Sequence, residues 1–291
     1  MKRYFPAIDG NQSITPEVAN WQYCGLSIFS DFVGDFEIPL QLTESSEAAL
    51  IPLKGRGIKL KIDGKEFNLN GRSGVFEGAT DWIYLAPGSR VEIRGDGEIE
   101  IALATARAEK RFPTIYVAKS DVVEIRGSGS ATREIRPFMH PDNFANAVKL
   151  NAVEVITPDG NTSSYPPHRH DGIGDCPFHN EEIYYFRIGE IGQSHGSNSG
   201  FGFHRTYSAP QDSDFFDDNI SVRDGDIYLV DRGYHGPCTA LPGYPMYYLN
   251  VLAGPNLERN MGFCDDPTYS HIRQDWTNQR PDPRIPWRIS K

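Results

Sequence analysis

The sequence predicts an all-β protein with two β-sandwich or jelly-roll barrel domains in tandem. Twenty-eight glycines and 21 prolines are spread along the chain and separate short runs of β-type residues. Many short strands with Gly and Pro turns are typical of sandwiches and barrels, and long helical periodicity is hard to find. A chain of 291 residues is long enough for two domains of ordinary size.

Each predicted strand has either β-type composition or a two-residue alternation of apolar and polar side chains. Ile58-Lys-Leu-Lys-Ile62 is the clearest alternating segment. In the first half we predict strands at residues 48–53, 57–62, 82–85, 90–93 and 98–105. In the second half we predict them at residues 152–157, 182–187, 202–207, 226–230 and 247–252.

A short internal similarity indicates that the two halves are related. Asp81-Trp-Ile-Tyr-Leu-Ala-Pro-Gly88 resembles Asp226-Ile-Tyr-Leu-Val-Asp-Arg-Gly233. The second copy continues to His235, whereas the first continues to Arg90 without a histidine, and all eight histidines lie at His140 or later. The sequence therefore predicts a duplicated β-barrel in which only the second half carries a metal site.

The segment from Arg107 to about Ala147 is expected to connect the two halves. It contains the turn-rich stretch Arg126-Gly-Ser-Gly-Ser130. We predict a degenerate N-terminal domain at residues 1–135, a metal-binding domain at 136–275 and a C-terminal tail at 276–291. Three prolines in the tail suggest that it wraps the surface in extended form or joins an oligomer contact, with fraying as the alternative.

The run Tyr165-Pro-Pro-His-Arg-His-Asp171 is the strongest functional signal in the chain. On an extended strand His168 and His170 point to the same face, and the Pro-Pro dipeptide before them restricts the chain to extended geometry. Glu182 and His235 follow on later strand-like segments, with a separation suited to opposite sheets of a barrel. We predict that these four residues hold a divalent metal ion.

Other ligand sets are also open. Glu181 competes with Glu182, because adjacent strand residues face opposite sides and only one can point inward. His179, His195 and His204 are alternative ligands, and a coincidental polar cluster is the simplest alternative. Imidazole and carboxylate ligands suit Zn, Mn, Fe or Ni; zinc is the expected ion, with manganese or iron as alternatives.

Composition excludes several classes of partner. A formal net charge of −10 argues against nucleic acid or an anionic membrane surface, and no apolar run approaches the ~20 residues of a membrane span. The first residues lack the apolar core of a signal peptide. The four cysteines are scattered without a CxxC motif, so we expect free thiols and a cytoplasmic protein.

At the predicted metal ligands the chain resembles a cupin. More narrowly, it resembles the 5-deoxy-glucuronate isomerase family of inositol catabolism. The similarity covers most of residues 45–270 in order and spacing. It includes Asn70-Gly-Arg-Ser-Gly-Val-Phe76, Val153-Glu-Val-Ile-Thr-Pro-Asp-Gly-Asn161, the run around His168 and His170, and Glu181-Glu-Ile-Tyr-Tyr-Phe186. The resemblance implies a bicupin with metal only in the second domain, and it favours Glu182 as the carboxylate ligand.

The resemblance also implies the reaction, an aldose–ketose isomerisation of 5-deoxy-glucuronate to 5-dehydro-2-deoxy-gluconate. Two positions depart from the family pattern: Arg169 stands where the family usually has Lys, and Thr162 where it usually has Trp. Lys and Arg are not interchangeable in a site. The sequence does not distinguish a hydride shift from an enediolate route.

Catalytic residues are expected in the second domain. The substrate carboxylate should meet an arginine, because a planar guanidinium offers it a two-pronged match. Arg205 is the first choice, since strand placement could direct it inward, with Arg169, Arg187 and Arg223 as alternatives. Candidates for a base are Tyr247, Tyr165, Tyr184, Tyr234 and Glu181.

Two functions from other classes stay open. A cupin with this ligand set could be an Fe(II) dioxygenase, or it could be a non-catalytic module that binds sugar acids. An isomerase of a related uronate is a third alternative. The expected partner is a small sugar acid, and a homodimer is the default oligomer.

Overall fold

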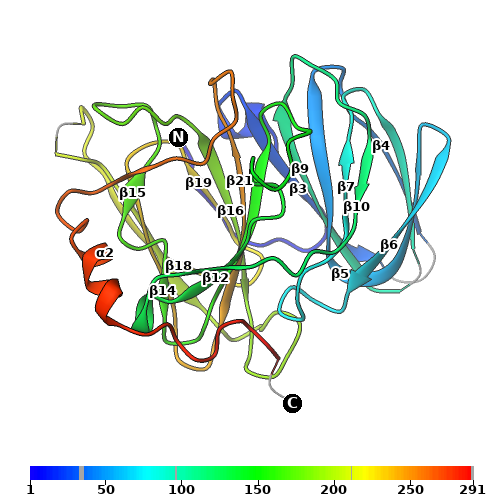
Figure 1. The fold of residues 1–291 in the computed structure, drawn as a ribbon. Helices are drawn as coiled ribbons and strands as arrows, with labels where there is room; N and C mark the ends of the chain where they lie inside the picture. The colour runs from blue at the N-terminus through cyan, green and yellow to red at the C-terminus, as the bar shows by residue number, and fades with distance from the viewer. Residues whose placement is uncertain (33–35, 96, 211, 290–291) are drawn as a thin grey trace.

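The computed structural model describes residues 1–32, 36–95, 97–210 and 212–289. This part of the chain is nearly all β, as predicted (Figure 1). Its helical segments are single turns: α1 (Pro16–Ala19), η1 (Gly129–Ala131), α2 (Ile272–Asp275) and η2 (Trp276–Asn278). Among the described residues, no helix is long and apolar enough to cross a membrane.

The first half of the chain forms one curled sheet. Its main path runs β10 (Ile115–Val117), β7 (Trp82–Leu85), β5 (Ser46–Ile62), β9 (Ile99–Arg107), β3 (Cys24–Phe32) and β2 (Gln12–Ile14). Off this path lie β4 (Phe36–Gln41), β6 (Lys65–Arg72) and β8 (Arg90–Gly95). Strand β5 joins two segments predicted as separate strands, with a bulge between Pro52 and Lys54.

The second half forms two facing sheets. The first has the order β1 (Tyr4–Phe5), β19 (Ile227–Val230), β16 (Glu181–Ile188), β21 (Met246–Ala253), β13 (Asn151–Thr157), β12 (Arg133–Arg136) and β11 (Glu124–Arg126). The second has β18 (Asp217–Val222), β17 (Gly202–Tyr207), β20 (Tyr234–Ala240), β15 (His168–Arg169) and β22 (Cys264–Asp265), with β14 (Thr162–Ser163) beside β20.

All ten predicted segments fall on these strands to within a residue. Of the strands with six or more residues, β3, β4, β6, β18 and β20 were not predicted. In β20 the reason is clear: Tyr-His-Gly-Pro-Cys-Thr-Ala contains a glycine and a proline, which weaken the β pattern.

Three apolar cores follow from this arrangement. One is built within the N-terminal sheet, around Leu50, Leu60 and Ile93. A second lies between the two C-terminal sheets, around Phe186 and Ala240. The third joins the halves, because β3 packs against β16 and β21, and β9 packs against β21.

Two glutamates on equivalent strands fasten this contact between the halves. Glu47 of β5 accepts hydrogen bonds from the backbone N–H groups of residues 148–150, just before β13, at 2.6–2.8 Å. Glu181 of β16 accepts them from residues 22–24, at the start of β3, at 2.7–3.0 Å. Each carboxylate therefore satisfies three N–H groups of the opposite half.

The C-terminal tail is held by several contacts. Trp287 is buried; its backbone N–H donates to Glu134 at 2.6 Å and its indole N–H to the carbonyl of Phe76 at 3.0 Å. Arg284 bonds Asp159 and Asp282. In Figure 1 this red segment runs from α2 along the second half to the C-terminus.

Candidate metal centre

The four predicted ligands come from both C-terminal sheets. His168 of β15 and His235 of β20 are direct cross-strand partners, and Glu182 is the second residue of β16 in the opposite sheet. His170 follows β15 on the same side as His168. All but His168 are buried, and His235 has no exposed surface.

Three of the four converge on one point. The ligand atoms of His170, Glu182 and His235 lie within 4.8 Å of one another. Oε2 of Glu182 is 3.0 Å from Nε2 of His170 and 3.1 Å from Nε2 of His235. Yet Nε2 of His235 makes no hydrogen bond, although it is sealed from solvent. A buried ring nitrogen without a hydrogen-bond partner, facing a carboxylate oxygen, is the arrangement that a divalent cation would satisfy.

His168 lies just outside this group. Its ring centroid is 4.4 Å from that of His235 and 6.4 Å from that of His170. It lines the same cavity, of about 110 Å³, as His170, Glu182, Tyr184 and Tyr248. It therefore lies beside the group, and its role as a fourth ligand stays a prediction.

Backbone carbonyls orient the rings of the paired histidines. Nδ1 of His168 is 3.1 Å from the carbonyl of Pro166, and Nδ1 of His170 is 3.0 Å from that of Asn180. A carbonyl only accepts, so in the neutral rings these Nδ1 atoms carry the hydrogen and each Nε2 keeps its lone pair. This is the usual way that proteins fix metal-binding histidines.

The charges of the group favour cation binding. Burial, together with the neighbouring rings, lowers the pKa of His168, and burial lowers that of His235 despite Glu182, so both rings are neutral at pH 7. Burial alone would raise the pKa of Glu182, but the hydrogen bond to His170 and the nearby ring of His235 outweigh burial and lower it. For His170, the bond to Glu182 outweighs burial and raises the pKa.

The expectation that strand placement directs Arg205 inward is wrong. On β17 the neighbours His204 and Thr206 are fully buried, so Arg205 faces outward. Its Nε and Nη2 donate to Asp217 at 2.8 and 2.7 Å. A guanidinium held in this way on the outer face does not reach the cavity.

Tyr247, another catalytic candidate from the sequence, also lies away from the cavity. It points from β21 toward the N-terminal half, where its hydroxyl donates to Glu154 at 2.8 Å and its ring packs against Phe76. Tyr248 faces the cavity instead. Because alternate strand residues point to opposite sides, an error of one residue reverses the face.

Arg169 lies on the side of the strand that faces away from the cavity. It lies between the two histidines and therefore points to the other side of the strand. It donates to Asp171 at 2.9 and 2.6 Å and to Asp212 at 3.2 Å. Since both carboxylates are buried with it, Arg169 is a structural ion-pair centre and does not contact the cavity.

Most of the remaining candidates from the sequence lie away from the cavity. Of the alternative arginines and bases, only Tyr184 lines the cavity; Arg187 pairs with Glu100 and Asp224. Of the alternative ligands, His204 is buried beside Cys238 and Thr206, and His195 lines a different groove.

The sequence reasoning missed several polar residues that line the cavity. Ser164 Oγ lies 3.1 Å from the hydroxyl of Tyr184 and 3.2 Å from that of Tyr248. The side-chain nitrogen of Asn250 is buried without a partner, and Arg133 lies at the edge of the same cavity. Strand alternation could have found Tyr248 and Asn250, because Tyr184 and Phe186 share a face with Glu182. The cross-strand partners of Tyr184 and Phe186 on β21 are Asn250 and Tyr248.

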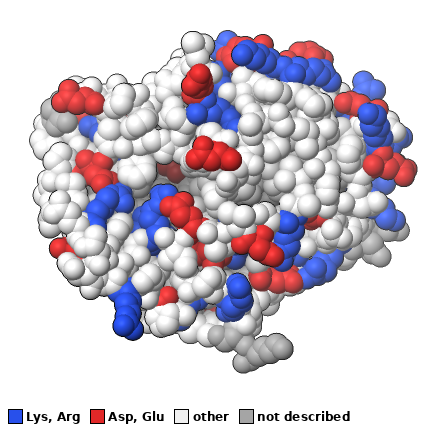
Figure 2. Space-filling model, in the orientation of Figure 1, with Lys and Arg blue, Asp and Glu red and all other residues white. Residues whose placement is uncertain are grey.

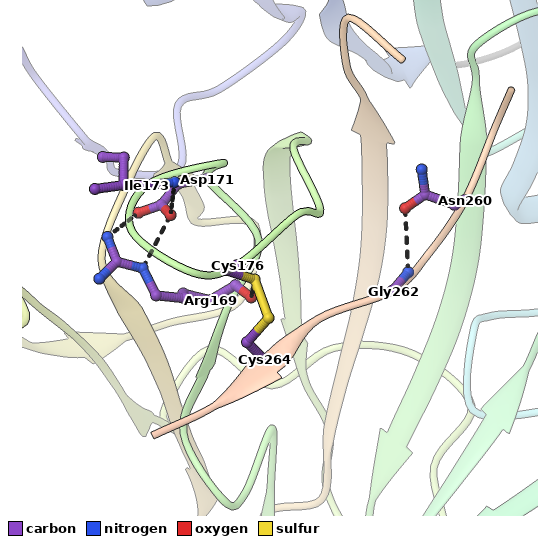
Figure 3. The surroundings of a disulfide bond; sticks show 7 residues. All are labelled: Arg169, Asp171, Ile173, Cys176, Asn260, Gly262 and Cys264. Atoms are coloured by element: carbon purple, nitrogen blue, oxygen red, sulfur yellow. Dashed lines mark hydrogen bonds and ion pairs between the residues drawn. A yellow bond between two sulfur atoms is a disulfide. The ribbon is translucent and has the colours of Figure 1, made fainter. Parts of the chain in front are cut away.

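The prediction of four free thiols is wrong for two of them. Cys176 and Cys264 form a disulfide (Figure 3). Cys24 and Cys238 are free. The two bonded cysteines are 88 residues apart in sequence. They meet because Cys264 of β22 pairs with Arg169 of β15, and the loop after β15 brings Cys176 back to that position. The disulfide thus ties the loop after His170 to the segment carrying Phe263, whose ring is 4.7 Å from His168.

This fold and site define a cupin-like protein with a histidine–carboxylate cluster of the kind that binds divalent metal. Oxalate decarboxylase from Bacillus subtilis shares the fold, with a TM-score of 0.58 at 12% identity over 91% of this chain and 79% of that one. A structure described as an IolB-like protein from Salmonella typhimurium LT2 is more similar, with a TM-score of 0.81 at 27% identity over 94% of this chain and 99% of the other.

The chain belongs to the KduI/IolB family, whose model matches residues 5–272. A 5-deoxy-glucuronate isomerase from Geobacillus kaustophilus is 35% identical over 92% of this chain and 93% of its own length. The protein of that name from Shouchella clausii is 39% identical over 69% and 71%. The family resemblance inferred from the sequence is confirmed.

Proposed function

We propose that this protein is a metal-dependent aldose–ketose isomerase that converts 5-deoxy-glucuronate to 5-dehydro-2-deoxy-gluconate in inositol catabolism. One observation carries the proposal: His170, Glu182 and His235 converge beside a cavity that the first two line, in a chain similar over 92% of its length to a protein named for this activity. The relatives named above favour an isomerase over a dioxygenase or a non-catalytic binding module.

His168, His170, Glu182 and His235 would hold the metal. A divalent ion bound there would supply a Lewis acid for the sugar carbonyl and its neighbouring hydroxyl. Zinc is the proposed ion because imidazole and carboxylate ligands suit it. Manganese stays an alternative, since a structural neighbour, oxalate decarboxylase, has Mn(II) centres, and iron remains a second one.

Hydroxyl groups in the cavity would donate hydrogen bonds to the substrate and transfer its proton. Burial raises the pKa of Tyr184 and of Tyr248, in both cases well above neutrality. Both phenols therefore stay protonated and can donate hydrogen bonds to substrate oxygens. Ser164 lies between them and could pass a proton from one to the other.

We also infer that the two halves are tandem cupin domains. Two facts support this: the strand order β10-β7-β5-β9-β3 parallels β1-β19-β16-β21-β13, and Glu47 and Glu181 occupy equivalent positions. At the position equivalent to Glu182 the first half has Ala48, which supports a first domain without metal. We keep residues 1–135, 136–275 and 276–291 as the proposed divisions, although β1, β11 and much of β12 pair with the second half's sheet.

The same proposal includes the location and the partners. We place the protein in the cytoplasm, as a homodimer, with a sugar acid as ligand and without nucleic acid or membrane partners. The net charge of −10 supports the last point, and acidic and basic residues are interspersed on the face in Figure 2.

A substrate comparison tests the proposal. Protein loaded with zinc, manganese or iron is supplied with 5-deoxy-glucuronate, glucuronate or a 4-deoxy-5-keto uronate, and turnover is followed by NMR. We expect the first compound to be isomerised fastest. Conversion of another uronate without conversion of 5-deoxy-glucuronate would reassign the substrate, and oxygen consumption by the iron form would indicate a dioxygenase.

A further inference from the structure

We propose that Arg133, supported by Arg126, forms the subsite that binds the carboxylate of the sugar acid. The inference rests on the proposed function, because it places an anionic group of the substrate in the cavity of the metal centre. It assigns a role to a residue from a segment that sequence reasoning treated only as a connection.

Arg133 is a buried arginine without a carboxylate partner among the described residues. Only 4% of it is exposed. The other buried arginines of the second half are neutralised: Arg169 by Asp171 and Asp212, and Arg136 by Glu134. Burial without such a partner lowers the pKa of Arg133 to about 10, because desolvation disfavours its charge. An anion would remove this cost.

The free edge of the guanidinium has the geometry that a carboxylate needs. Only Nη1 of Arg133 is engaged among the described residues, donating to the carbonyls of Ala131 and Tyr165 at 3.2 Å each. Nε and Nη2 are left for a ligand. Arg169 and Arg205 use this same edge to hold Asp171 and Asp217 with two hydrogen bonds each. A substrate carboxylate could bind Arg133 in the same two-pronged way.

Two like charges are also placed side by side. Arg126 of β11 is the direct cross-strand partner of Arg133 of β12, and both line the cavity. Like charges opposite each other destabilise a sheet. Glu124 pairs with Arg126 at 2.6 Å and leaves Arg133 unpaired. The local charge is thus arranged to favour an anion at Arg133.

The subsite lies at the right end of the cavity for a sugar acid. Glu182, Asn250, Val153 and Ile135 stand on successive strands of one sheet and line the cavity with Arg133, so a ligand there can contact both ends. The carboxylate and aldehyde are at opposite ends of the six-carbon chain. Along the sheet, Asn250 lies between Glu182 and Arg133, and its unpartnered side-chain nitrogen is available for a substrate hydroxyl.

The C-terminal segment helps to position this arginine. The guanidinium of Arg133 lies over the ring of Trp276, 5.4 Å from its centroid, and Ser128 Oγ donates to the Trp276 carbonyl at 3.1 Å. Stacking holds the guanidinium plane without using its donors. The tail thereby forms part of the wall of the carboxylate subsite.

The test uses Arg133→Met, Arg133→Lys and the control Arg205→Met in the full-length, metal-loaded protein. We expect R133M to raise KM for 5-deoxy-glucuronate about 10- to 100-fold, the effect of losing a charged two-pronged bond. R133K, which keeps the charge without the fork, should be intermediate. Metal content should be unchanged in all three, and R205M should match the wild type.

A second arm separates this inference from the proposed function. Calorimetric titration compares glucuronate with glucose, which has CH₂OH in place of the carboxylate. The wild type should prefer glucuronate, and R133M should lose that preference while binding glucose as before. Unchanged KM and an unchanged preference in R133M would overturn the inference and leave the isomerase intact. A wild type without turnover would remove the proposed function, and the titration would still decide the role of Arg133. If R133M does not fold, R133K carries both measurements.

Discussion

Glu181 and Glu182 are consecutive on β16, yet their carboxylates serve opposite sides of the sheet. Glu182 faces the cavity, with Oε2 3.0 Å from Nε2 of His170. Glu181 faces the N-terminal half and accepts the backbone N–H of Gln22 at 2.7 Å. One glutamate belongs to the metal centre, and the other joins the halves of the molecule.

This relationship predicts different results for two neighbouring substitutions. Glu182→Gln should lose bound metal and turnover, because a neutral amide is a poor ligand. Glu181→Gln should keep metal and activity but lower the midpoint of thermal unfolding, because one of its three N–H donors would face an amide NH₂ group. Metal analysis and calorimetry check both. Equal metal loss in the two variants would contradict the assignment.

The paired tyrosines of β21 give a second test. Tyr248→Phe should lower kcat about 100-fold, since it removes a hydroxyl that we place on the substrate. Tyr247→Phe should leave kcat unchanged and reduce the free energy of unfolding by about 1 kcal/mol, through the lost bond to Glu154. Steady-state kinetics and urea unfolding of both variants check this. The reverse pattern would restore Tyr247 as the catalytic residue.

The disulfide should contribute to stability. In the Cys176→Ser/Cys264→Ser variant we expect a loss of roughly 2–4 kcal/mol, the usual effect for a long loop. Reductant should lower the unfolding midpoint of the wild type and leave that of the double variant unchanged, which provides an internal control. An identical response of both proteins to reductant would show that the bond does not form in solution.

Asp171 should make stability depend on acid pH. Burial raises its pKa, but the hydrogen bonds and charge of Arg169 outweigh burial and lower it below the ordinary value of 3.8. Its contribution is therefore complete above the unfolded pKa and is lost as pH falls through the folded pKa. The difference in unfolding free energy between wild type and Asp171→Asn should be constant above about pH 5 and shrink in stronger acid. A difference that grows on acidification would contradict this.

Much of the fold was predictable, because period-two patterns and Gly or Pro turns mark buried strands directly. Part of the ligand group was predictable for a similar reason, because strand geometry places His168 and His170 on one face. The choice of Glu182 over Glu181 came from the family resemblance. Long-range placement was not predictable. The bridge between Cys176 and Cys264 depends on which strands pair, and Arg205 on which face its strand buries.

The arginines that line the cavity could not be chosen from the sequence. All four arginines selected from the sequence lie near the histidines along the chain, but none lines the cavity. Arg133 does so because β12 joins the edge of the C-terminal sheet, which only the tertiary structure reveals.

The most direct test of the central claim is reconstitution of metal-free protein. Apo protein should leave the aldehyde resonance of 5-deoxy-glucuronate unchanged in the NMR spectrum. After one equivalent of divalent metal is added, the aldehyde resonance should disappear and the ketose should appear. We expect this in the wild type but not in His170→Ala. Full turnover by the chelated protein, or by His170→Ala without bound metal, would contradict the account.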